Sequence, residues 1–302
     1  MDRLAPIADL LSGPPRRILE AGPLDRPLVR SGTHVVQYLD HLSTDELRDK
    51  YMIDTAVDLS RVPEIDFVIR DNDLTPILET GSRFDLVIGS HMFEHLPDPL
   101  GWLTQISRLL NPDGGVYLVV PDRRYSFDMM RPDTTLSEWI ESYLLQRRHP
   151  SVRSVFDNFA LPVDPEGRNV WVGSFEPGSV PVMDGHGPKT ALPIATRAAK
   201  GQYIDAHCSV FSPWSLVDLF RQAANLDLFP FRVAGIWPTD YRDTEFSILL
   251  KPWNDGDSLG TRFPSLDRAR HDGRPSVWTQ PDILKRRAAN LIARVTRRVF
   301  RV

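Results

Sequence analysis

Residues Phe84–Asp122 read FDLVIGSHMFEHLPDPLGWLTQISRLLNPDGGVYLVVPD. The apolar run Phe84–Gly89 predicts a strand, the polar cluster Ser90–His95 follows it, and a helical pattern comes next. The turn signal Asn111–Gly115 then leads into a second apolar run, Val116–Val120. The stretch therefore predicts a strand, a helix and a strand, with ionisable side chains at the carboxyl end of the first strand. Open α/β sheets bind their ligands at that end.

The rest of the chain continues this alternation. Apolar runs predict further strands at residues 16–22, 35–40 and 65–69, and a closing pair, expected to be antiparallel, at 231–237 and 244–251. Helical patterns cover residues 43–51, 135–146 and 213–224. Ser43, with Glu46 three residues later, predicts a capped start for the first of these helices. Strands dominated by apolar residues and separated by helices indicate a mainly parallel sheet that is covered on both faces.

Two motifs in the opening stretch, SHMFEHLPD (Ser90–Asp98) and NPDGG (Asn111–Gly115), resemble the second half of a class I S-adenosyl-L-methionine (SAM) dependent methyltransferase. The resemblance covers about residues 16–122. It implies an α/β fold: a Rossmann-like seven-stranded methyltransferase sheet with helices on both faces and a reversed seventh strand. SAM would be the cofactor. The chain is similar to methyltransferase type 11-like proteins of a bacterial group associated with polysaccharide biosynthesis.

The candidate cofactor residues lie at the ends of predicted strands. Glu20 and Gly22 begin a tight turn, and Asp40 ends the next strand at the spacing expected for a carboxylate that binds ribose. The resemblance adds Asp71, or its neighbours Asn72 and Asp73, beside the adenine. It also places Ser90 and His91 at the methionine end.

The first motif departs from the family pattern. The usual form is ExGxGxG, whereas Leu24 and Arg26 stand here at the second and third glycine positions. Pro23 and Pro27 stiffen the same loop, since proline fixes its own backbone torsion. A side chain at these positions narrows the room for a nucleoside unless the loop follows a different path.

His91, Glu94 and His95 have the spacing i, i+3, i+4, so a helix that begins at His91 would place them on one face. In one interpretation His91 or His95 is a general base near the methyl group. In a second, the three residues bind a divalent metal, and the imidazoles favour zinc, iron or nickel over magnesium. In a third, Glu94 and His95 only cap the helix and orient the loop. The sequence leaves these three alternatives open.

Asp205 and His207 flank a single residue, so in a strand they would face the same side. Such a pair can act as a base, with Asp205 orienting the imidazole. Recognition of a substrate hydroxyl and a structural role for His207 in the core are the alternatives.

Arg123, Arg124 and Tyr125 follow the fifth predicted strand at the same edge of the sheet. The two guanidinium groups can hold a phosphate or carboxylate of the substrate. The alternative is that they form salt bridges at the rim.

Composition limits the class of protein. The net charge of −4 argues against bulk attraction to nucleic acid, so we expect no nucleic-acid partner. The single cysteine, Cys208, excludes an intramolecular disulfide and fits a reducing cytoplasm. No apolar run reaches the roughly 18–20 residues that span a bilayer, and the N-terminus lacks a secretory signal pattern.

Four segments are predicted: a SAM-binding half at 1–122, a substrate-binding lid at 123–206, the completion of the sheet at 207–256 and a basic tail at 257–302. Aromatic side chains that can stack on sugar rings are spread through the lid: Trp139, Tyr143, Trp171 and Phe175. Residues 262–302 carry eleven Lys or Arg against three Asp, and 282–302 have the pattern of a basic amphipathic helix. That helix can make peripheral contact with the inner face of the plasma membrane, or it can dock on protein.

The leading hypothesis is therefore a SAM-dependent methyltransferase that O-methylates a sugar or glycan intermediate. A catalytically silent, methyltransferase-like binding module in a glycan-assembly complex is the main alternative, because two glycines are missing. A nucleic-acid methyltransferase that uses the arginine-rich tail is disfavoured by the acidic net charge and by the lack of an asparagine-proline catalytic tetrad.

Overall fold

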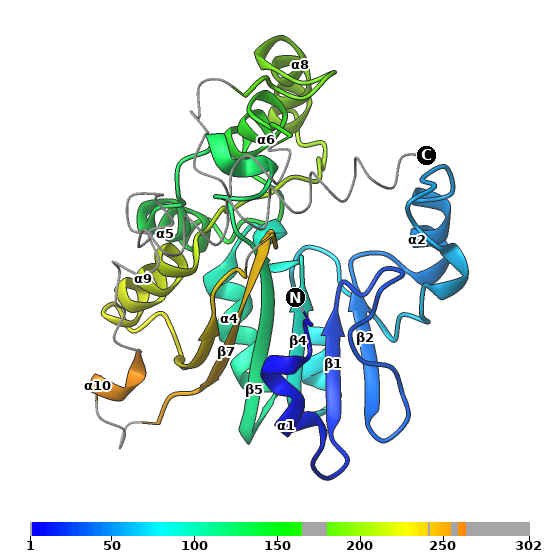
Figure 1. Ribbon diagram of the computed structural model, residues 1–302, viewed down its shortest axis with the longest axis vertical. Helices are drawn as coiled ribbons and strands as arrows, with labels where there is room; N and C mark the ends of the chain where they lie inside the picture. The colour runs from blue at the N-terminus through cyan, green and yellow to red at the C-terminus, as the bar shows by residue number, and fades with distance from the viewer. Residues whose placement is uncertain (1, 165–179, 241, 255–258, 264–302) are drawn as a thin grey trace, which may run out of the picture.

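The computed structural model describes residues 2–164, 180–240, 242–254 and 259–263. Within them, one seven-stranded sheet has the order β3-β2-β1-β4-β5-β7-β6 (Figure 1). The strands are β1 (Arg17–Ala21), β2 (Val35–Asp40), β3 (Phe67–Val68), β4 (Phe84–Ser90), β5 (Leu110–Pro121), β6 (Phe231–Trp237) and β7 (Glu245–Pro252). Strands β1 to β5 pair in parallel, and β7 is antiparallel to both β5 and β6. The predicted methyltransferase sheet with a reversed seventh strand is confirmed.

Helices cover one face of this sheet. They are α3 (Thr75–Glu79), α4 (Pro99–Leu109) and α9 (Pro213–Ala224), with α5 (Leu136–Leu144) packed behind them. Helix α4 begins sharply because the Asp98 side chain accepts the Gly101 N–H at 2.9 Å and Pro99 holds the first turn. Its Trp102 and the Phe220 of α9 are fully buried, and burying side chains of this size contributes about 2–3 kcal/mol each.

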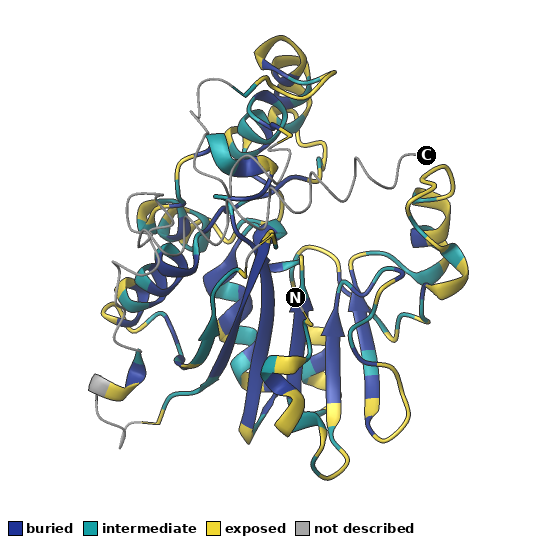
Figure 2. Cartoon of the chain, viewed as in Figure 1, coloured by how far each residue is buried: buried dark blue, intermediate teal, exposed yellow. Residues whose placement is uncertain are grey.

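The opposite face is covered differently. The short helices η1 (Ala5–Ile7) and α1 (Ala8–Leu11) lie against it together with the loop that joins β1 to β2. Ile7 and Val29 are buried there, and the Tyr117 hydroxyl donates to the Arg3 carbonyl at 2.6 Å. Helices on both faces were predicted, but only one face carries long ones. The strands between the two layers are mostly buried (Figure 2).

The capped helix predicted at residues 43–51 is present as α2 (Thr44–Lys50). Ser43 accepts the Glu46 N–H while the Glu46 carboxylate accepts the Ser43 N–H, which is a reciprocal capping box. Four further helices have only a single turn: η2 (Leu59–Arg61), η3 (Phe93–His95), η4 (Phe127–Met130) and α10 (Leu259–Arg262).

The segment after β5 contains more helix than the single pattern predicted at residues 135–146. Helix α5 matches the pattern at 135–146, but α6 (Val152–Ala160) and α8 (Pro188–Ala199) were not predicted. They pack on each other through Val155 and Ala195, beyond the carboxyl edge of the sheet at the top of Figure 1. Helix α8 begins with Pro188, which is compatible with a helix start because the first helical N–H needs no partner within the helix.

Trp139, proposed above to stack on sugars, is instead part of the core. It is fully buried against Phe93, Phe211 and Phe220, and its Nε1–H donates to the Ser209 hydroxyl at 3.0 Å. Tyr143 packs partly buried against the same core. Trp171, Phe175 and the predicted helix at 282–302 lie outside the described residues. Among the described helices, none is long and apolar enough to cross a membrane.

Candidate active site

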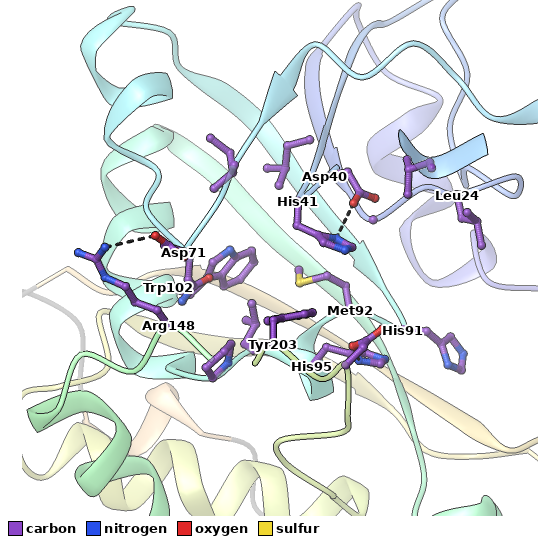
Figure 3. A pocket seen from close by; sticks show the side chains of 18 of the residues that line it. Leu24, Asp40, His41, Asp71, His91, Met92, His95, Trp102, Arg148 and Tyr203 are labelled. Carbon is purple, nitrogen blue, oxygen red and sulfur yellow. Dashed lines mark hydrogen bonds and ion pairs between the residues drawn. The ribbon is translucent and has the colours of Figure 1, made fainter. Parts of the chain in front are cut away.

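A pocket of about 270 Å³ opens where β1, β2, β3 and β4 end (Figure 3). Gly22, Asp40 and His91, which follow or end three different strands, all line it. The carboxyl ends of parallel strands meet at one edge of a sheet, which is why residues so far apart in the sequence converge here.

Asp40 is the buried acid of this pocket. Its Oδ1 accepts the Leu42 N–H at 3.3 Å and lies 2.7 Å from Nδ1 of His41. Within the described part of the chain, no hydrogen bond falls on its Oδ2. The carboxylate can therefore accept hydrogen bonds from two vicinal hydroxyls, the arrangement that a ribose needs.

The loop after β1 keeps the pocket open although two glycines are missing. Gly22 and Leu24 both have positive φ, +67° and +42°, and Pro23 accepts the Arg26 N–H at 3.0 Å in a tight turn. Leu24 forms part of the pocket wall, whereas the Arg26 side chain is 72% exposed and does not line the pocket. The unusual residues therefore redirect the loop without closing the cleft.

Glu20 holds this loop from beneath. Its two carboxylate oxygens accept the N–H groups of Leu28 and Val29 at 2.6 and 3.1 Å. Burial raises the pKa of Glu20 to about 7, although these backbone bonds oppose the shift. Neither Glu20 nor Ser90, both predicted to bind cofactor, lines the pocket. We assign Glu20 the role of fixing the loop that does.

The part of the pocket next to the end of β3 is mainly apolar. Ile69, Leu74, Leu96 and Trp102 line it and suit an aromatic base. Asp71, at this end, pairs with Arg148 at 3.3 Å (Figure 3). The neighbouring Asn72 lines the pocket too, but its amide donates to the Asp98 carbonyl at 3.3 Å.

Sequence reasoning missed several residues of the wall, namely Met92, Trp102, Arg148 and Tyr203. The last two, Arg148 and Tyr203, come from the segment 123–206, the predicted lid. Their positions depend on how that insertion folds back, and no local motif marks them.

Directly after β4, His91 does not begin a helix. It has φ +50°, and only Phe93–His95 form a helical turn, so the predicted common helix face is wrong. Nε2 of His91 instead lies 2.6 Å from the Glu245 carboxylate, which also receives two hydrogen bonds from Arg3. Burial works against ionisation of Glu245, but its bonds from His91 and Arg3 outweigh burial and lower the pKa to about 2.

The other two predicted histidines have different partners from those expected. Asp205 lies beside His95, Oδ1 to Nδ1 2.9 Å, whereas His207 Nδ1 meets Asp128 Oδ2 at 2.5 Å. The predicted pair of Asp205 with His207 is wrong because residues 202–207 form no strand, so the alternation of sides does not apply. Burial lowers the pKa of His95, but the bond from Asp205 and the charge of Glu94 prevail and raise it.

Arg123 and Arg124, the predicted substrate anchors, are engaged within the protein. Arg123 donates hydrogen bonds to Asp133 at 2.8 Å and to two backbone carbonyls. Arg124 donates hydrogen bonds from two of its nitrogens to the Asp122 carboxylate. Tyr125 is buried beneath the Arg124 guanidinium. None of the three lines the pocket, so the structure favours the salt-bridge interpretation.

The predicted metal triplet is also arranged differently. Glu94 and His95 lie together, but the third residue whose donor atom joins them is His207, and His91 is turned toward Glu245. One donor atom from each of Glu94, His95 and His207 lies within 4.8 Å of the other two.

A family model described as a methyltransferase domain matches residues 2–171, more than half of the chain. The chain belongs to this methyltransferase family. It is a SAM-dependent methyltransferase. The pocket opens at the carboxyl ends of β1 to β4, the edge at which parallel sheets bind their ligands.

Solved structures resemble this methyltransferase only distantly. A SAM-dependent methyltransferase from Aquifex aeolicus is 12% identical with TM-score 0.36, covering 82% of this chain and 92% of its own. One from Methanosarcina mazei is 16% identical with TM-score 0.39, covering 83% and 99%. A Rhodobacter sphaeroides protein named for zinc-dependent alcohol dehydrogenases is 14% identical with TM-score 0.43, covering 80% and 86%. No curated protein matches the sequence.

Proposed function

We propose that this methyltransferase transfers the SAM methyl group to a hydroxyl of a sugar or glycan intermediate in polysaccharide biosynthesis, in the cytoplasm. The observation that carries the proposal is the His91–Glu245 pair at the methionine end of the pocket. A hydroxyl must lose its proton as the methyl group arrives, so an oxygen acceptor needs a base at this position.

His91 is suited to that role by its surroundings. Its side chain lines the pocket, is 37% exposed, and is held through Nε2 by the buried carboxylate of Glu245. Nδ1, which lies 3.7 Å from Oε1 of Glu94, is then the ring nitrogen that takes the proton, and Glu245 stabilises the imidazolium that forms. The sulfonium already activates the methyl group, so the remaining tasks are alignment and exclusion of water.

The glycan part of the proposal rests on the resemblance to methyltransferases associated with polysaccharide biosynthesis and on the polar groups around the entrance. Asp205, Tyr203 and His41 offer donors and acceptors of the kind that sugar hydroxyls use. The acceptor that carries the hydroxyl can be a monosaccharide, a nucleotide sugar or a lipid-linked oligosaccharide.

The test begins with calorimetric titration of the full chain with SAM and with its demethylated product, S-adenosyl-L-homocysteine (SAH). Labelled SAM is then supplied with a panel of nucleotide sugars and oligosaccharides, and the position of the methyl group is read by NMR. An O-methyl sugar supports the proposal. SAH binding without transfer to any panel member, but with transfer to RNA, DNA or a nitrogen acceptor, overturns it.

His91→Gln separates chemistry from binding. Removing a general base costs about 10²–10⁴ in rate, so kcat should fall by at least about 100-fold while SAH affinity stays within a few-fold. The catalytically silent alternative predicts no transfer by the wild type at all, and no cellular effect of Asp40→Ala.

A further inference from the structure

Glu94, His95 and His207 form a cluster beside the pocket that the transfer reaction above does not use. Glu94 and His95 belong to η3, and His207 belongs to the segment that leads into α9. The Glu94 carbonyl accepts the N–H groups of Cys208 and Ser209 at 2.7 and 3.1 Å, which fixes the two segments against each other. The cluster is therefore part of the rigid frame of the fold.

The Glu94 carboxylate is buried and lacks hydrogen bonds. The residue is 1% exposed, and neither Oε1 nor Oε2 has a hydrogen-bond partner among the described residues. The nitrogen paired with it, Nδ1 of His91, is 3.7 Å from Oε1. An ionised carboxylate so deeply buried is costly unless a cation meets it or it coordinates a metal.

Both histidines are held by carboxylates through the same ring atom. Asp205 contacts Nδ1 of His95 and Asp128 contacts Nδ1 of His207, so Nε2 is the remaining nitrogen of each ring. Among the described contacts, no hydrogen bond falls on either Nε2. Metal-binding histidines are typically held this way, because a carboxylate on one nitrogen fixes the ring and raises the basicity of the other.

We infer that Glu94, His95 and His207 bind one divalent transition-metal ion, through a carboxylate oxygen and two Nε2 atoms. Two imidazoles and one carboxylate favour zinc, iron(II), cobalt or manganese and leave coordination positions open. The three donor atoms need to move only slightly closer to one another, because donors that are each about 2.1 Å from a shared ion lie roughly 3–4 Å apart.

His95 links the proposed metal to the pocket, because it belongs to both. An open position on the metal can therefore be filled by water or by an oxygen of the acceptor, whose acidity the metal would increase. This second role rests on the proposed function, with His91 as the base, whereas the binding of the metal does not depend on it.

The test uses the full chain after treatment with a chelator. Cobalt(II) and zinc are titrated and followed by the visible bands of cobalt and by calorimetry, on the wild type and on Glu94→Gln and His207→Gln. His91→Gln is the matched control, because it removes a histidine of the same pocket that is outside the proposed set. SAH titration of every variant shows whether the fold and the cofactor site survive.

One ion per chain is expected, with affinity reduced at least about 30-fold in both Glu94→Gln and His207→Gln and changed less than about threefold in His91→Gln. In the wild type alone, NMR of the cobalt form should show two shifted exchangeable ring N–H signals, one from each carboxylate-held Nδ1. This second measurement needs no variant to fold.

The inference is overturned if one-to-one binding is missing at about 100 µM cobalt or zinc, or if Glu94→Gln binds as the wild type does. It is also overturned if His91→Gln loses as much affinity as His207→Gln. Because SAH binding is measured in parallel, a wild type that binds SAH but no metal refutes the metal site and leaves the proposed function standing.

Discussion

Replacing Asp40 with asparagine should weaken cofactor binding by a predictable amount. Two ribose hydroxyls can donate to this buried carboxylate, one to Oδ2 and one to Oδ1, which already serves the Leu42 N–H and His41. A hydrogen bond to a charged group contributes about 1.5–3 kcal/mol, and we assign the shared Oδ1 the lower end or less. Asparagine keeps the shape and one acceptor but loses the charge, so the expected loss is about 2–3 kcal/mol, or roughly 30–150-fold in Kd.

The assay is calorimetric titration of SAH into the wild type, Asp40→Asn and Asp73→Asn. Asp73 is a matched control because it follows β3 nearby, does not line the pocket, and is bonded to Thr75. Asp73→Asn should bind SAH within about twofold of the wild type. If Asp40→Asn also binds within about threefold and melts at the wild-type temperature, Asp40 does not hold the ribose and the assignment of the pocket is wrong.

Three further outcomes are expected. Because its bonds lower the pKa of Glu245 to about 2, Glu245 adds stability that is complete above its ordinary pKa of 4.5 and is lost as the pH falls toward 2. The shift corresponds to about 3 kcal/mol, or about 2 kcal/mol after allowance for the partly exposed His91. The free energies of unfolding of the wild type and Glu245→Gln, measured in urea, should therefore differ by about 2 kcal/mol at pH 7 and by less below pH 4.5. A difference that is the same at both pH values contradicts this reasoning. Gly89→Ala would bring a Cβ within 2.9 Å of the Met92 methyl, and Met92 lines the pocket. Calorimetry should therefore show a free energy of unfolding lower by about 1–2 kcal/mol and an SAH affinity reduced several-fold. Unchanged SAH binding would show that Met92 moves away from the pocket. Removing residues 264–302 should abolish sedimentation with anionic liposomes, while equal pelleting of both forms would exclude a membrane role for the basic tail.

The convergence of Gly22, Asp40 and His91 on one pocket could be predicted from the sequence. Gly22, Asp40 and His91 each stand at the end of an apolar run, and parallel strands bring their carboxyl ends together whatever the connecting loops do. The capping box at Ser43 and the antiparallel pair β6–β7 could also be predicted, because each depends on a local sequence pattern.

The glycine motif shows the limit of such patterns. Leu24 and Arg26 suggested that the nucleoside pocket would be narrowed. In the structure, hydrogen bonds to the Glu20 carboxylate fix the loop, and the charged side chain of Arg26 lies in solvent. The path of the loop is set by hydrogen bonds to residues eight and nine positions later, which a motif does not encode.

By itself, the sequence determined the type of the strands along the chain, the family and the edge of the sheet at which the pocket opens, because hydrophobic periodicity and turn residues act over a few positions. Only the tertiary structure decided which carboxylate holds which histidine. Glu245 is 154 residues from His91, Asp205 is 110 from His95 and Asp128 is 79 from His207. Contacts over such separations form when whole elements pack, so the identity of each partner, and with it the role of each histidine, follows from the packing of the insertion and of β7 against the end of β4.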